Sequence, residues 1–147
     1  MDIKDIHSVA DIILLGAAEK PDEEMIIFGD ERITWQQRKD RSSQVANALR
    51  ADGVGPGDRV AYVDKNGPEY FELAFACGFM NAVTVAVNWR LTPIEMTYII
   101  NDAQANVLVI HEELAEHLAA MEGALPDVHR VVVIGSHDTH ISYQEWR

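Results

Sequence analysis

Side chains of the types that bind metals or transfer protons occur at two places late in the chain. His111-Glu112 matches the first half of an H-E-x-x-H zinc motif, in which the two histidines lie four residues apart on one helical face. The next histidine here is His117, six residues on, so the two rings cannot share a face. His137 and His140 lie in a polar stretch with no third ligand nearby, which is typical of solvent-exposed histidines. The sequence therefore predicts no metal site.

Asp64-Lys65 comes directly after an apolar run, where α/β proteins place functional loops. A phosphoacceptor site needs acidic residues at several strand ends, and here only this one acid appears. Asn66 and Glu69, which follow, have the spacing of a helix cap and its capping-box partner, and this role suffices to explain them.

The glycines of the segment GVGPGD are candidates for a phosphate-binding loop. Gly53, Gly55 and Gly57 do not fit the G-x-G-x-x-G spacing, and they stand before a predicted strand rather than after one. We therefore expect a helix end followed by a tight turn, with no bound phosphate.

The elements that position these residues are clearest between Val83 and Val109. The run 83–87 is β-branched and apolar on both faces, which predicts a buried strand of a parallel sheet. Thr92 is the expected N-cap of the next helix, with Pro93 at its first position and Glu95 as the capping-box acid. Four further residues of that helix have the spacing of a core-facing stripe: Met96, Ile99, Ile100 and Ala103.

Strand-like runs recur at a nearly constant interval of about 24 residues, the length of a strand plus a crossover helix. They are predicted near residues 60–63, 83–87, 107–110 and 131–134. The helix expected between the first two, 68–80, is apolar nearly all round and should be buried on more than one side. Parallel strands joined by right-handed crossovers give a doubly wound or related α/β sheet.

The first sixty residues predict a helix, a β-hairpin and a second helix. Ser8 caps the first helix, and the runs 25–28 and 32–34 flank the turn Gly29-Asp30-Glu31. The second helix starts at Thr34, with Gln37 three residues later completing a capping box, and ends at Gly53.

Composition limits the possible functions. The 147 residues suffice for one domain, and 48% apolar content is ordinary for a globular protein. A formal charge of −12 argues against a nucleic-acid partner.

The most apolar early segment, 9–18, is too short to span a bilayer and is interrupted by Asp11, and no basic leader precedes it, so we expect a cytoplasmic protein. The single cysteine, Cys77, fits a reducing compartment and is expected to be a packing residue.

The segment Asn88-Trp89-Arg90-Leu91-Thr92-Pro93-Ile94-Glu95 resembles the N-R-L-x-x-x-E segment of AMP-forming acyl-CoA synthetases, in the adenylate-forming superfamily. Other similar pieces occur in the family's order along essentially the whole chain: Arg32-Ile33-Thr34-Trp35, then 53–61, then Asn66 with Glu69. Two positions depart from the family pattern, since Asn81 and Ala86 stand where Gly and Pro are usual. Asn tolerates a left-handed backbone better than most residues, so Asn81 is expected to preserve the turn.

The resemblance implies two-step chemistry, in which ATP adenylates a fatty or related carboxylic acid and coenzyme A then displaces AMP. It implies ATP, magnesium and CoA as cofactors of the complete enzyme. The motifs that carry this chemistry in the family are a phosphate loop with a lysine, an aromatic-Thr-Glu segment, a ribose-binding Asp and a C-terminal-domain lysine, and none occurs in residues 1–147. We therefore expect no catalytic, cofactor-binding or metal-binding residue in this chain. The family-motif positions are expected to be scaffold: Asn66, Glu69, Asn88, Arg90, Leu91 and Glu95.

Ser142 and Glu145 form a further capping box, yet only Trp146 and Arg147 follow it. Our first hypothesis is that residues 1–147 are the N-terminal portion of a synthetase's large N-terminal domain, without its phosphate loop and C-terminal domain. The isolated chain is then expected to be inactive, with the remainder of the synthetase as its partner and an exposed strand edge that makes a homo-oligomer plausible.

Two other hypotheses remain open. The chain is a non-catalytic α/β module that pairs with itself or with a partner, or it is a nucleotide- or flavin-binding domain. The latter lacks a phosphate-binding turn after a strand.

Overall fold

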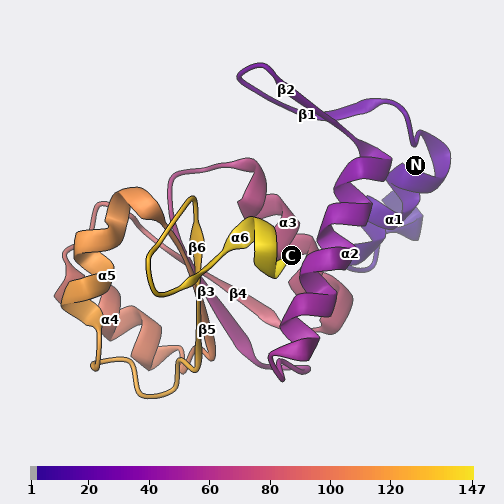
Figure 1. The fold of residues 1–147 in the computed structure, drawn as a ribbon. Coiled ribbons are helices and arrows are strands. Elements are labelled where there is room, and N and C mark those ends of the chain that lie inside the picture. Colours follow the sequence, from indigo (N-terminus) through magenta and orange to yellow (C-terminus); the bar gives the residue numbers. More distant parts are fainter. Residues whose placement is uncertain (1–2) are drawn as a thin grey trace.

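The computed structural model describes residues 3–147 and contains a five-stranded, all-parallel sheet (Figure 1). Four strands confirm the predicted runs, and a fifth, very short strand was not predicted because two residues carry no periodic pattern. The strands are β3 (Arg59–Val63), β4 (Val83–Val87), β5 (Val107–His111), β6 (Arg130–Ile134) and β7 (Ile141–Ser142), in the order β4-β3-β5-β6-β7.

Helices cover both faces of this sheet (Figure 1). One face packs against α2 (Trp35–Ala51), α3 (Pro68–Met80) and α6 (Tyr143–Trp146). The other packs against α4 (Pro93–Asp102), the short 3-10 helix η2 (Glu112–Leu114) and α5 (Ala115–Met121). Successive residues of β3 point to opposite faces, so Val60 and Tyr62 join the first core and Ala61 and Val63 the second.

The N-terminal elements lie beside this layered unit. A 3-10 turn, η1 (Ile3–Asp5), leads to α1 (Val9–Glu19), which packs against α2 and α3. β1 (Glu24–Phe28) and β2 (Glu31–Thr34) form the predicted antiparallel hairpin, which projects away from the sheet (Figure 1). The predicted turn was one residue too long, since Glu31 pairs with Phe28 and already belongs to β2.

β4 is an edge strand, so the prediction of a buried strand at 83–87 is wrong. Within residues 3–147 it pairs only with β3, and the side chain of Val83 is 49% exposed. An apolar pattern on both faces indicates what a strand could bury, but it does not indicate how many neighbours the strand has.

Helix starts follow the predicted caps in four of five cases. Ser8, Thr34 and Thr92 each accept a hydrogen bond from the backbone N–H three residues on and complete a capping box, and Ser142 caps α6 through the N–H of Glu145. The exception is Asn66, because the N-cap of α3 is Gly67, which is extended and makes no side-chain cap bond. Gly67 precedes Pro68 as Thr92 precedes Pro93, so the proline marks the first helical position in both helices.

α3 is largely buried, as its composition predicts, although Phe71 is exposed. Cys77 lies in the core, which confirms it as a packing residue. Asn81 ends the helix with a left-handed backbone, φ 54°, and so preserves the turn as expected.

Candidate functional site

The carboxyl edge of the sheet contains a topological switch point. After β3 the chain turns to α3 on one face, whereas after β5 it turns to η2 and α5 on the other face. Crevices at such points are the usual ligand sites of open α/β sheets. A cavity of about 280 Å³ lies at this point and is lined from both strand ends, by Asp64 and Lys65 after β3 and by His111 at the end of β5 and Glu113 after it.

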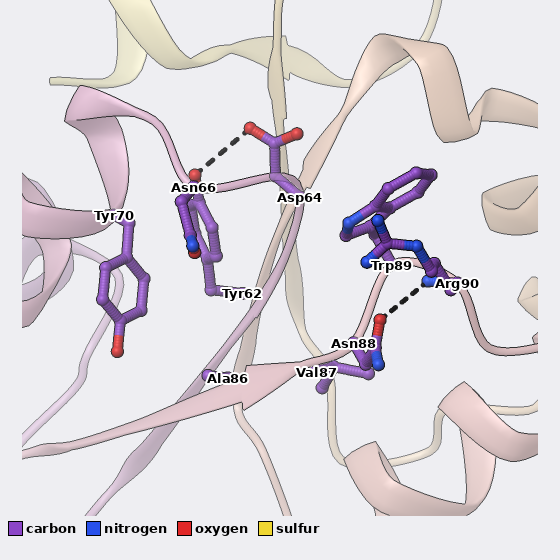
Figure 2. A pocket seen from close by; sticks show the side chains of 9 residues that line it. All are labelled: Tyr62, Asp64, Asn66, Tyr70, Ala86, Val87, Asn88, Trp89 and Arg90. Carbon is purple, nitrogen blue, oxygen red and sulfur yellow. Dashed lines mark hydrogen bonds between the residues drawn. The ribbon is translucent and has the colours of Figure 1, made fainter. Parts of the chain in front are cut away.

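A second cavity, of about 370 Å³, lies between the ends of β3 and β4 (Figure 2). Aromatic, amide and charged side chains line it: Tyr62, Asp64, Asn66, Tyr70, Asn88, Trp89 and Arg90, beside Ala86 and Val87. A smaller cavity of about 110 Å³ has Lys65, Trp89 and Glu113 among its lining residues. All three cavities share Asp64, and together we call them the carboxyl-edge recess.

The loop after β4 is held by its own side chains. The backbone N–H of Arg90 donates to Oδ1 of Asn88 at 3.0 Å (Figure 2). The guanidinium of Arg90 lies over the Trp89 ring, 4.3 Å from its centroid, and Nζ of Lys65 lies 5.2 Å from the same centroid. Trp89 therefore has a cation contact from each of two strand ends.

Glu95 and Leu91 lie outside the recess. Both carboxylate bonds of Glu95 go to Thr92, from its N–H and its hydroxyl at 2.8 Å each, and they lower the pKa of Glu95. Leu91 packs against the second core. Among the family-motif positions, the structure brings Asn66, Glu69, Asn88 and Arg90 to the recess and leaves Leu91 and Glu95 in the scaffold of α4.

The recess has an excess of carboxylates. Burial, together with the neighbouring carboxylates of Glu72, Asp64 and Glu31, raises the pKa of Glu69. The hydroxyl of Tyr62 donates to Oδ2 of Asp64 at 3.2 Å, and burial beside that carboxylate raises the pKa of Tyr62. The ammonium of Lys65, 2.6 Å from Oε2 of Glu113, lowers the pKa of Glu113.

These residues do not fit the phosphates of ATP. Phosphate binding needs free backbone N–H groups or unpaired cations. At this edge, among the residues described, Lys65 is paired with Glu113 and the guanidinium of Arg90 lies over the ring of Trp89. Asp64 and Glu69 add negative charge to the lining of the recess. Aromatic rings and amide groups make up much of the lining of the recess, together with the carboxylates of Asp64, Glu69 and Glu113 and the ring of His111.

The two histidine pairs make separate local contacts. Within residues 3–147, no three histidine, cysteine or acidic side chains are arranged to hold a metal ion. Nδ1 of His111 accepts from the N–H of Glu113 and so caps η2. His137 and His140 are not fully exposed as predicted, since their ring centroids lie 4.9 Å apart and both are partly buried; the loop after β6 brings His140 to within 3.6 Å of Glu122 at the end of α5.

Sequence reasoning missed a buried ion-pair cluster behind the recess. Glu72 of α3 and Arg38 of α2 lie 3.0 Å apart, and both side chains are almost fully inaccessible to solvent. The available indication was a single acid inside the otherwise apolar face of α3. Its partners come from distant elements, so the pattern of α3 alone could not identify them.

Within the described part of the chain, no helix is long and apolar enough to cross a membrane. The sequence matches the AMP-binding enzyme family over residues 15–146. It is 32% identical over 131 residues to a fatty acid–[acyl-carrier-protein] ligase of Streptomyces coeruleorubidus, covering 89% of this chain and 24% of that protein. It is 41% identical over 105 residues to a feruloyl-CoA synthase of Amycolatopsis sp, covering 71% of this chain and 21% of that protein.

Among solved structures, an anthranilate CoA ligase in complex with anthranoyl-AMP superposes with a TM-score of 0.90 at 28% identity. The match covers 99% of this chain and 28% of that protein. The chain thus spans about a quarter of the length of the relatives that it matches.

Proposed function

This chain belongs to the AMP-binding enzyme family, and from that premise we propose that it is the N-terminal part of an AMP-forming acyl-CoA synthetase. The observation that carries the proposal is the family match over residues 15–146, together with relatives that are about four times as long as this chain. The relatives' names support the reaction class, since they include a feruloyl-CoA synthase and a long-chain-fatty-acid–CoA ligase of Thermus thermophilus.

The complete enzyme would join a carboxylate to ATP, with release of pyrophosphate. The thiol of coenzyme A would then attack the acyl carbon, form the thioester and release AMP. We place magnesium, ATP and CoA with the complete enzyme, because the recess of this chain does not fit the phosphates. The substrate class is a fatty or an aromatic carboxylic acid, as in the named relatives.

Residues 1–147 then have a scaffold role in the large N-terminal domain, and the remainder of the synthetase is their partner. Asn88 and Arg90 fix the loop after β4, Glu95 caps α4, and Leu91 anchors the segment between them in the second core. Asn66 and Glu69 form the wall of the recess. No residue of this chain is assigned a catalytic role, and the cytoplasm is the proposed location.

The test is ATP–pyrophosphate exchange by the polypeptide encoded by the complete reading frame. A long-chain fatty acid, ferulate and 3-hydroxybenzoate serve as carboxylates, with the 147-residue chain assayed in parallel. We expect exchange by the long polypeptide with at least one acid and none by the short chain. A folded long polypeptide without exchange on any acid would overturn the proposal. A reading frame that stops directly after Arg147 would favour the non-catalytic module instead.

A further inference from the structure

The helices on one face of the sheet carry neither lysine nor arginine. Residues 91–129, which include α4, η2 and α5, contain seven of the 24 acidic residues of the chain and none of its 12 lysines and arginines. More than half of the formal charge of −12 therefore belongs to about a quarter of the sequence. The layer that α4 and α5 form is much more negative than the rest of the molecule.

A groove of about 430 Å³ lies between the two helices of this layer. Figure 1 shows α4 and α5 next to each other on one side of the sheet, and the two helices are in contact. Nδ2 of Asn101 on α4 donates to the carbonyl of Ala124 after α5 at 2.9 Å, which ties the two walls together. The groove is therefore formed before any partner binds. Apolar and small side chains line it: Thr92, Pro93, Ile94, Thr97, Ala120 and Ala124.

Exposed apolar side chains stand beside acidic ones along this groove. Ile94 and Tyr98, one helical turn apart on α4, are 83% and 70% exposed, more than any other large apolar side chain in the described part of the chain. Asp102 follows Tyr98 by one further turn, and on α5 Glu116 precedes Ala120 by one turn. Both acids are exposed, so the groove has an apolar interior and a negative rim.

This combination restricts what can occupy the groove. A membrane surface and a nucleic acid are both negatively charged, so the rim repels them. A second copy of this chain is a poorer occupant, because it brings the same formal charge of −12. An amphipathic helix fits, since its apolar side chains can enter the groove while its lysines and arginines face the acidic rim.

We propose that the groove between α4 and α5 is a docking surface for a basic amphipathic helix of another protein. The apolar contact is centred on Ile94, and the acidic rim attracts and orients the partner. The inference goes beyond the proposed function and does not rest on it, because no residue that lines this groove lines the carboxyl-edge recess.

The probe for this surface is a fluorescein-labelled peptide of about 14 residues, long enough to form a helix, with leucine at i, i+3, i+4 and i+7 and lysine elsewhere. Fluorescence anisotropy measures its binding to the 147-residue chain and to the polypeptide encoded by the complete reading frame. We expect both to bind it, with affinity that falls about tenfold or more between about 0.05 and 0.5 M NaCl. Peptides with glutamate in place of lysine, or serine in place of leucine, should each bind about tenfold more weakly or worse.

Two variants with matched controls locate the binding. Ile94→Ser should weaken it about fivefold or more, whereas Val9→Ser, at a 52% exposed residue of α1, should change it less than about twofold. Glu116→Lys should likewise weaken it about fivefold or more. Asp30→Lys makes the same change of charge in the exposed hairpin turn and should change it less than about twofold. All four side chains are exposed, so the variants should keep the wild-type melting temperature.

Several results would overturn the inference. Equal weakening by Glu116→Lys and Asp30→Lys would reduce the binding to net charge, and an unchanged affinity of Ile94→Ser would exclude the groove. Binding by the 147-residue chain alone would show that the remainder of the longer polypeptide covers the groove. A dimer at low salt that Ile94→Ser dissociates would assign the groove to a second copy. Absence of ATP–pyrophosphate exchange contradicts only the proposed function, since the peptide assay does not depend on activity.

Discussion

At the scale of single residues, Thr92 and Asn66 resemble each other in sequence but not in role. Each lies one or two residues before a proline that begins a helix, and each has an acid three residues on. Thr92 caps α4 through its hydroxyl, whereas Gly67 takes the N-cap position of α3 and Asn66 faces the recess. The distinction follows from where the proline falls, because proline at the first helical position assigns the cap to the residue directly before it.

We predict that Thr92→Ala lowers the free energy of unfolding by about 1 kcal/mol, the usual loss for an N-cap. Asn66→Ala is the matched control, and it should change that free energy by less than about 0.5 kcal/mol, as is usual away from caps and cores. Urea denaturation of both variants measures the difference. Equal losses would show that Asn66 has a capping role after all.

The carboxylate of Glu95 makes stability depend on pH. Its folded pKa lies below its ordinary value of 4.5 because the N–H and hydroxyl of Thr92 donate to the charged form. A depressed folded pKa gives stability that is present above the unfolded pKa and is lost as the pH falls through the folded one. Glu95→Gln should therefore be less stable than the wild type at pH 7, and the gap should close as the pH falls below 4.5. Denaturant midpoints at several pH values test this, and a gap independent of pH would contradict it.

At the scale of elements, the end of α3 depends on a left-handed residue. Asn81 has φ 54°, which most side chains adopt only at a cost of about 1–2 kcal/mol. Asn81→Ala should therefore lower the melting temperature. Asn81→Gly should leave it unchanged or raise it, because glycine adopts this conformation freely. The pair is its own control, and the same loss in both variants would assign the effect to the asparagine side chain.

The edge position of β4 determines which surface the molecule exposes. Val83 is 49% exposed on β4, and Ile94 and Tyr98 are exposed on the adjacent α4, at 83% and 70%. A free strand edge beside apolar side chains is a site of pairing with another chain. These features support the proposal that the 147-residue chain self-associates through β4 and α4.

At the scale of the whole molecule, the formal charge of −12 opposes self-association, because two like-charged copies repel each other. We predict that sedimentation velocity of the 147-residue chain shows association that increases with salt, and that Val83→Lys reduces it. Val9→Lys is the control, since Val9 is 52% exposed on α1, away from β4. A monomer at all salt concentrations would contradict the prediction.

Most of the fold could be predicted from local patterns. Four of the five parallel strands, the hairpin and the caps at Ser8, Thr34 and Thr92 follow from residues at most four positions apart. The family resemblance likewise rests on short segments in a fixed order, and the match over residues 15–146 confirms it. These features are local because hydrogen bonds within a helix and alternation along a strand are short-range.

The features that only the tertiary structure decided involve residues far apart in the chain. It placed β4 at the edge of the sheet, although its composition is that of a buried strand. It brought the ends of β3, β4 and β5 together as the carboxyl-edge recess. It also set Tyr143 against Glu72, 71 positions away. No periodic pattern records such a pairing, because the order of strands and the direction of each crossover arise from packing of the whole chain. The sequence therefore determined the elements and the family, and the packing of those elements determined where polar side chains meet.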